Sequence, residues 1–148
     1  MKELHSHIDI NASAERVWQL LTDFASYPQW NPFIRRISGE PTIGERLEVR
    51  LEPPESRGMT LRPKVLDAEP NHQLRWLRHL FVPGLFDGEH SLVIQSLGED
   101  RVRFVQGESF RGLLVPMFAR SLDNGTLRGF EEMNRALKER AEAATGGG

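Results

Sequence analysis

The chain has 148 residues, of which 39% are hydrophobic and 27% are charged, a balance that suits one water-soluble domain with a sizeable core. Its formal charge of -2 at pH 7 provides no basic field of the kind that holds phosphates, so we expect no nucleic acid partner. The lack of cysteine excludes disulfides and thiolate chemistry, and the histidines are not spaced as metal ligands, so we expect no metal and no other cofactor.

The chain also lacks the apolar segments that membranes and secretion require. No stretch is apolar over about 18 residues, so stable membrane insertion is not expected. The opening residues, MKELHSHIDI, lack the apolar centre of a signal peptide. We therefore expect a cytoplasmic protein.

A strand and two short helices are predicted first along the chain. Residues 3–10 alternate in polarity as a strand does, and Ser13 can cap a helix that begins at Ala14. The segment 25–28 breaks this helix and separates it from a second short one. The apolar residues of the first helix recur at helical spacing, with Trp18 at the edge of their stripe: Val17, Leu20, Leu21 and Phe24.

Strands and a long helix make up the rest of the chain. Between residues 33 and 110 the pattern predicts six strands separated by turns, each with one apolar and one solvated face. Residues 113–142 keep helical spacing over roughly 40 Å, at about 1.5 Å per residue. This order predicts an α+β protein in which residues 1–144 form a single domain and residues 145–148 form a disordered tail.

Four stretches of the chain carry a resemblance to a known family. They read IDINASAERVWQLLTDFASYPQWNPFI at 8–34, EPNHQLRW at 69–76, FDGEHSLVIQ at 86–95 and FVQGESFRGLL at 104–114. They resemble the START/Bet v 1-like superfamily, also called SRPBCC, in its polyketide cyclase/dehydrase-like branch. The resemblance implies a helix-grip fold, in which a seven-stranded curved antiparallel sheet surrounds a long C-terminal helix, and it implies a hydrophobic cavity.

Small residues in the last helix also indicate a cavity. Ser121, Gly125 and Gly129 lie on its predicted buried stripe, where they leave space between helix and sheet. The same glycines could instead permit close packing of the helix, and both interpretations stay open. The break between the short helices and the helix stop at Pro32 predict a movable lid over one end of the cavity.

Residues 88–110, GEHSLVIQSLGEDRVRFVQGESF, predict a β-hairpin with two polar residues on its apolar face. If residues 98–100 form a three-residue loop, the register places His90 directly opposite Glu108. The apolar residues of both strands then share a face with this pair. The arginines of the chain alternate with glutamates, which reads as a solvated surface, and we assign them no site.

Three roles for His90 and Glu108 stay open. As a structural pair they satisfy each other and fix the register of the strands. As a ligand anchor they offer a donor or an acceptor at the cavity wall. As an acid–base dyad, Glu108 orients the imidazole while His90 moves protons on an enolisable carbonyl.

We therefore predict that the protein binds a hydrophobic or amphipathic small molecule, lipid- or polyketide-like, in a cavity between the sheet and the C-terminal helix. The alternative is an aromatase/cyclase- or dehydratase-like enzyme in which His90 and Glu108 are the catalytic candidates. The apolar small molecule is the expected partner, and the sequence specifies no protein partner. The expected ligand-binding residues are Trp76, His90, Phe104, Glu108, Phe110, Met117, Phe118, Ser121, Gly125 and Gly129.

Overall fold

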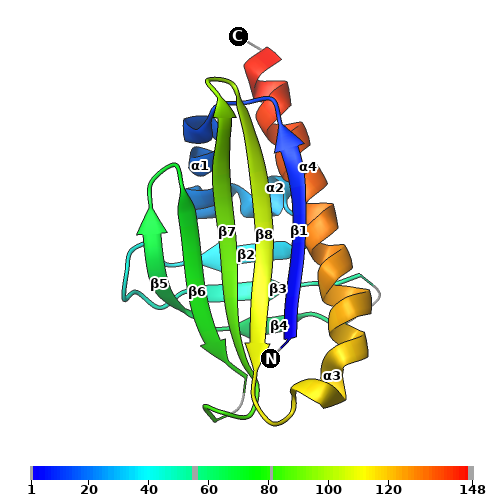
Figure 1. The fold of residues 1–148 in the computed structure, drawn as a ribbon. Helices are drawn as coiled ribbons and strands as arrows, with labels where there is room; N and C mark the ends of the chain where they lie inside the picture. The colour runs from blue at the N-terminus through cyan, green and yellow to red at the C-terminus, as the bar shows by residue number, and fades with distance from the viewer. Residues whose placement is uncertain (1, 55–56, 81, 147–148) are drawn as a thin grey trace.

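The strands form two antiparallel sheets, and the longest helix runs along the gap between them (Figure 1). The structure, a computed structural model, describes residues 2–54, 57–80 and 82–146. The five-stranded sheet has the order β1-β8-β7-β6-β5, and the three-stranded sheet has the order β2-β3-β4. The predicted α+β helix-grip fold is confirmed.

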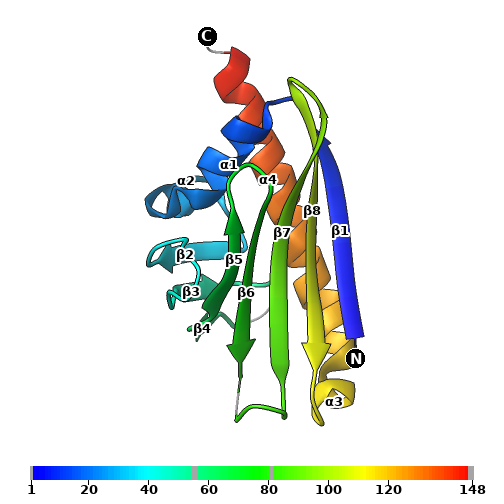
Figure 2. The same ribbon diagram turned by 60° about the vertical axis from the view of Figure 1, so that its left-hand side comes forward.

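The described residues contain eight strands rather than the seven that were expected. The five-stranded sheet consists of β1 (Lys2–Ile10), β5 (Lys64–Glu69), β6 (Gln73–His79), β7 (Asp87–Gly98) and β8 (Arg101–Arg111). The other sheet consists of β2 (Ile34–Ser38), β3 (Glu48–Leu51) and β4 (Met59–Leu61). Figure 2 shows that β2–β4 run across the direction of the strands in the larger sheet.

The additional strand arises because the chain changes sheets between β4 and β5. Pro63 lies at this change, and its nitrogen has no hydrogen to donate to a strand ladder. Its carbonyl oxygen accepts a hydrogen bond from the backbone nitrogen of Leu47 at 2.8 Å. One continuous strand is therefore replaced by two short strands in different sheets.

The N-terminal segment has the predicted arrangement of a strand and short helices. The side chain of Ser13 accepts a hydrogen bond from the backbone nitrogen of Arg16 at the start of α1 (Ala14–Thr22). After Asp23 come a 3-10 turn, η1 (Phe24–Ser26), and a second short helix, α2 (Tyr27–Trp30). The break therefore lies a few residues earlier than residues 25–28.

The C-terminal helix is long, as predicted, but one of its turns is wound more widely. It consists of α3 (Val115–Ser121), the π-helical turn η2 (Leu122–Thr126) and α4 (Leu127–Gly146). Such turns are rare and often occur at functional sites. Thr145 and Gly146, expected in the tail, belong to α4, and residues 147–148 of that tail lie outside the described part of the chain.

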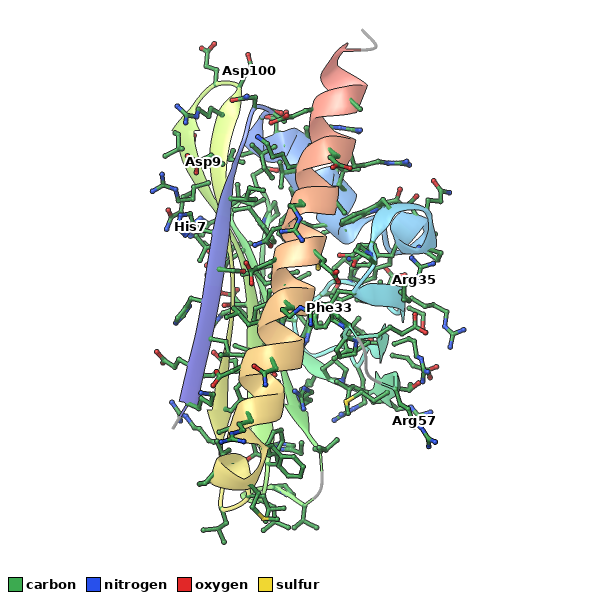
Figure 3. All side chains as sticks on the ribbon, turned by 90° about the vertical axis from the view of Figure 1, so that its right-hand side faces the viewer. His7, Asp9, Phe33, Arg35, Arg57 and Asp100 are labelled. Atoms are coloured by element: carbon green, nitrogen blue, oxygen red, sulfur yellow. The ribbon has the colours of Figure 1, made fainter. Side chains whose placement is uncertain are left out.

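Helix α4 closes the space between the two sheets, as Figure 3 shows from the side. Its buried residues follow helical spacing and join the core formed by the inner faces of both sheets: Phe130, Met133, Leu137 and Ala141. Phe33, which precedes β2, packs edge-on against Phe130 with ring centroids 5.7 Å apart. In residues 2–54, 57–80 and 82–146, no helix has both the length and the apolar composition needed to cross a membrane.

Substitutions at two glycines of the C-terminal helix test this packing. A Cβ on Gly129 would collide with the ring of Phe33, whereas a Cβ on Gly125 would meet only Pro53, at 3.8 Å. Gly129→Ala should therefore lower the free energy of unfolding by about 1–3 kcal/mol through overpacking. Gly125→Ala, the matched control, should be neutral or stabilising, since alanine favours helical structure. Urea unfolding measures both, and equal effects would contradict the packing described.

Candidate functional site: a pocket with a buried ion pair at its wall

The predicted hairpin register is confirmed. Strands β7 and β8 pair with His90 opposite Glu108, and the apolar residues of both strands lie on the same inner face. The turn differs from the three-residue loop that was expected. Gly98 pairs with Arg101, so two residues form the turn, and Leu97 is the extra residue of a bulge. The bulge restores the expected register in the rest of the hairpin.

His90 and Glu108 are in contact inside the protein. His90 Nδ1 lies 3.0 Å from Glu108 Oε1, and each residue is only 4% exposed. The second carboxylate oxygen, Oε2, accepts a hydrogen bond of 2.9 Å from Nη2 of Arg78. Glu108 therefore bridges two basic side chains, one on β6 and one on β7.

Arg78 is the residue of this cluster that the sequence analysis placed wrongly. It is 8% exposed and lies on the inner face of β6, not on the solvated surface assigned to the arginines. Its guanidinium carbon lies 6.0 Å from the ring centroid of Phe86 and 5.8 Å from that of Phe110. The signal was available, because Leu74, Trp76 and Arg78 alternate along β6 and therefore share one face.

Paired charges determine the ionisation of Glu108. Burial alone would raise its pKa, but the positive charge of Arg78 and the hydrogen bond with His90 outweigh burial and hold the pKa below its ordinary value. Glu108 is therefore a carboxylate in the folded protein at neutral pH. Arg78 and Glu108 together form a buried ion pair with no net charge.

A second set of polar residues continues from His90 through β8 and α4 to the neighbouring strand β1. His90 Nε2 lies 2.9 Å from Gln106 Oε1, and Gln106 Nε2 donates to Asn134 Oδ1 at 2.9 Å. Asn134 Nδ2 in turn donates to the hydroxyl of Ser6 at 2.9 Å. These residues were not predicted from the sequence, although Gln106 has the same strand parity as Glu108 and Asn134 lies on the buried stripe of α4.

Aromatic rings hold the imidazole of His90 from two sides. The ring of Trp76 stacks on it at 5.2 Å with an interplanar angle of 10°, and Phe130 contacts it edge-on at 5.2 Å. Both ring nitrogens face side chains of β8, as described above. The imidazole is therefore in contact with side chains of β6, β8 and α4.

A pocket of about 470 Å³ lies next to this cluster, between the β3–β4 side of the grip and the π-helical turn η2. Its wall is mainly apolar, with Leu51, Leu80, Phe86, Phe118 and Leu122 among its residues. Its polar side chains are Arg78, Glu108, Asn124, Thr126 and Arg128. Asn124 and Arg128 are exposed, so they lie at the rim, whereas Arg78 and Glu108 form the buried base.

The structure brings only some of the predicted binding residues to this pocket. Glu108, Phe118 and Gly125 line it. Trp76, His90 and Phe110 form the layer behind it, in contact with one another or with Arg78 and Glu108.

Of the remaining four predicted residues, three lie elsewhere and the side chain of the fourth is not described. Phe104 is fully buried in the core, and Met117 is 75% exposed on the outside of α3. Gly129 packs against Phe33, so at this position the close-packing interpretation holds. The backbone of Ser121 ends α3, but its side chain lies outside the described part of the structure.

The pocket is also not at the end of the molecule where a lid was predicted. Its described wall contains no residue of α1 or α2, the helices expected to cover it. These helices lie toward the other end of the molecule from α3 (Figure 1). Asn31, which follows α2, has a structural role, because its Oδ1 accepts hydrogen bonds from the backbone nitrogens of Phe33 and Ile34.

The remaining histidines lie outside the pocket. His5 and His7 are exposed on β1, and His72 is exposed in a turn. His79 has an acidic partner on the neighbouring strand, since its Nδ1 lies 2.6 Å from Asp87 Oδ1. Among the described residues, no group of three or more histidine and carboxylate side chains is arranged to hold a metal ion.

The chain resembles known proteins in its sequence pattern and in its fold. The model of the family described as polyketide cyclase / dehydrase and lipid transport matches residues 1–142. No curated protein sequence matches the chain.

Several solved structures share the fold. The Zhui aromatase/cyclase from Streptomyces sp. R1128 is 17% identical with a TM-score of 0.76, over 95% of this chain and 93% of that one. A START superfamily protein from Mycobacterium smegmatis is 23% identical with a TM-score of 0.72, over 96% and 98% of the two chains. The di-domain aromatase/cyclase BexL is 14% identical with a TM-score of 0.74; 98% of this chain is covered, and it spans about half, 48%, of BexL. At these identities the likeness concerns the fold alone.

The buried ion pair should couple strongly in a double-mutant cycle. Arg78→Met or Glu108→Leu alone should each cost about 3–5 kcal/mol, because the partner stays buried and uncompensated. The double variant should be about 2–3 kcal/mol more stable than the sum of the single effects predicts. The matched control is the pair Arg75 and Glu89 on the outer face of β6 and β7, which is 3.0 Å apart compared with 2.9 Å for the buried pair, but more than one-third exposed. Its coupling should stay below about 1 kcal/mol. Additive effects at Arg78 and Glu108 in urea unfolding would contradict the ion pair.

The lowered pKa of Glu108 also predicts a response to acid. Since the folded-state pKa lies below the ordinary value of 4.5, the stabilisation is fully present above about pH 4.5 and is lost as the pH falls through the folded-state pKa. The free energy of unfolding of the wild type, measured between pH 7 and pH 3, should therefore fall more steeply than that of the Arg78→Met/Glu108→Leu variant. The other carboxylates with lowered pKa values, those of the half-buried Asp9, Asp87 and Glu142, are present in both proteins and contribute equally to both.

Proposed function

The chain belongs to the polyketide cyclase / dehydrase and lipid transport family, and from this premise we propose that it binds a hydrophobic or amphipathic small molecule in the pocket beside η2. The observation that carries the proposal is the composition of the pocket wall, which is mainly apolar and has one buried ion pair at its base. Apolar walls with few, fixed polar groups are typical of small-molecule sites.

The size of the pocket supports this function. Its volume of about 470 Å³ falls within the range of about 300–1,000 Å³ that is usual for small-molecule pockets. Phe86 and Phe118, which contact each other edge-on at 5.2 Å, offer apolar surface to the ligand. Burial of an apolar ligand against this wall would provide the main part of the binding free energy.

The π-helical turn supplies the space that the ligand would occupy. Gly125 is part of this turn, and a Cβ there would have a single neighbour within 4 Å, Pro53. The inward-facing small residue that the sequence analysis associated with a cavity is therefore Gly125 rather than Gly129. The family description includes lipid transport and polyketide cyclases, whose ligands would suit such a site.

Proton transfer by His90 is not the function that we propose. His90 is absent from the pocket wall, and its two nitrogens face Glu108 and Gln106. A general acid or base must come within hydrogen-bonding distance of the reacting group. Ligand binding, in contrast, requires only the wall and the ion pair as they stand.

A bulky side chain in the π-helical turn should block binding. Gly125→Leu would extend a side chain toward the pocket without a backbone collision, so we expect binding of the neutral fluorescent probe Nile red to weaken about tenfold or more. Titration of the probe against folded protein measures this effect. Stability should change by less than the roughly 1–3 kcal/mol that overpacking costs in a filled core.

The control variant is Ala143→Leu, which adds the same leucine side chain at an exposed position of α4. It should bind the probe as the wild type does. If Gly125→Leu is folded and also binds the probe like the wild type, the ligand does not occupy this pocket and the proposed function is wrong at this site.

A further inference from the structure

We propose that the pocket selects neutral ligands whose inner end carries a carbonyl oxygen, with Arg78 as the hydrogen-bond donor and Glu108 as the residue that rejects carboxylates. This inference rests on the proposed binding function and specifies the class of ligand. It depends on two features of the pocket base. The buried guanidinium of Arg78 has unused hydrogen-bond donors, and the carboxylate of Glu108 already neutralises the charge of Arg78.

The guanidinium of Arg78 has more donors than acceptors around it. Of its five N–H groups, one is used in the hydrogen bond from Nη2 to Glu108, and Nη1 has no acceptor among the described residues. The side chain is more than nine-tenths buried, and Arg78 is part of the pocket wall. Aromatic rings of Phe86 and Phe110 lie beside it and offer no carbonyl or carboxylate oxygen.

A buried donor without an acceptor costs free energy, which a ligand oxygen in the pocket would recover. Nη1 is shielded from solvent in this arrangement, so a ligand oxygen would reach it through a rotation of the guanidinium toward the pocket. The apolar remainder of the ligand would then lie along the wall formed by residues such as Leu51, Phe118 and Leu122. The geometry therefore favours an amphipathic molecule with its oxygen at the inner end.

The negative charge of Glu108 determines which kind of oxygen acceptor can bind to Arg78. The carboxylate of Glu108 lies 2.9 Å from Arg78 and is itself part of the pocket wall. A ligand carboxylate on Arg78 would therefore be placed close to a second carboxylate in a site with little water, and like charges repel strongly there. A ketone or ester carbonyl accepts the same hydrogen bond without adding charge.

Among the described residues of the pocket, no other group removes this repulsion. His90 already faces Oε1 of Glu108 and lies behind the wall. Arg128, the other basic residue of the wall, is exposed at the rim and has an interaction of its own. Glu108 is thus the residue that sets the preference for a neutral ligand.

Three ligands of equal chain length test the proposal on the wild-type protein. Methyl nonyl ketone, undecanoate and undecane compete with bound Nile red at pH 8, where the acid is ionised. We expect the ketone to displace the probe at concentrations about tenfold lower than either of the other two. Equal competition by all three, or a preference for undecanoate, overturns the inference while the proposed binding function stands. If neither Nile red nor any of the three binds, the proposed function itself fails.

Substitutions then assign the preference to named residues. Glu108→Gln keeps the shape of the side chain and removes its charge, so undecanoate should bind about tenfold more tightly than it does to the wild type. In Arg78→Met/Glu108→Leu the ketone should lose its advantage over undecane. Arg75→Met, on the outer face of the same strand, should leave the order of the three ligands unchanged. Circular dichroism verifies that each variant is folded, and if Glu108→Gln is not, the wild-type series and the double variant decide.

Discussion

One buried carboxylate, that of Glu108, organises the interior around the pocket. A carboxylate that leaves water is tolerated only where charged or hydrogen-bonding partners replace the lost solvation. Arg78 and His90 provide these partners, so that β6, β7 and β8 are linked across the inner face of the sheet. Gly88 makes this possible, because a Cβ at its position would collide with the carboxylate of Glu108 and lie 3.3 Å from the guanidinium carbon of Arg78.

The same constraint separates a packed layer from the wall of the proposed ligand pocket. Behind the ion pair, His90 is held by Trp76, Phe130 and two side chains of β8, which leaves it no group directed at the pocket. On the other side, the wall is formed by the π-helical turn, whose wider winding and glycine leave space. The helix-grip fold therefore places a fixed polar base opposite an apolar helical wall, which is an arrangement suited to binding.

Some residues of the site could have been recognised from their spacing alone. Arg78 and Gln106 follow the two-residue period of Trp76 and Glu108, and on a strand that period is sufficient to assign them to the inner face. They were missed because charge and polarity were taken as signs of exposure. A buried carboxylate has two oxygens, and His90 faces only one of them, which was itself a sign that one of the arginines lies inside.

The sequence by itself determined much of the local structure of this protein: the helix cap at Ser13, the succession of a strand, short helices, further strands and a long helix, and the opposition of His90 and Glu108. Each depends on contacts within a hairpin or a helical turn, where spacing along the chain defines spacing in the structure. Only the tertiary structure decided which end of the grip holds the pocket and which glycine lines it. Gly125 and Gly129 are equally compatible with the buried stripe of the helix. They differ in their neighbours: a Cβ on Gly129 would collide with Phe33, whereas a Cβ on Gly125 would lie 3.8 Å from Pro53. Both neighbours are far from the helix along the chain, so the spacing within the helix does not reveal them.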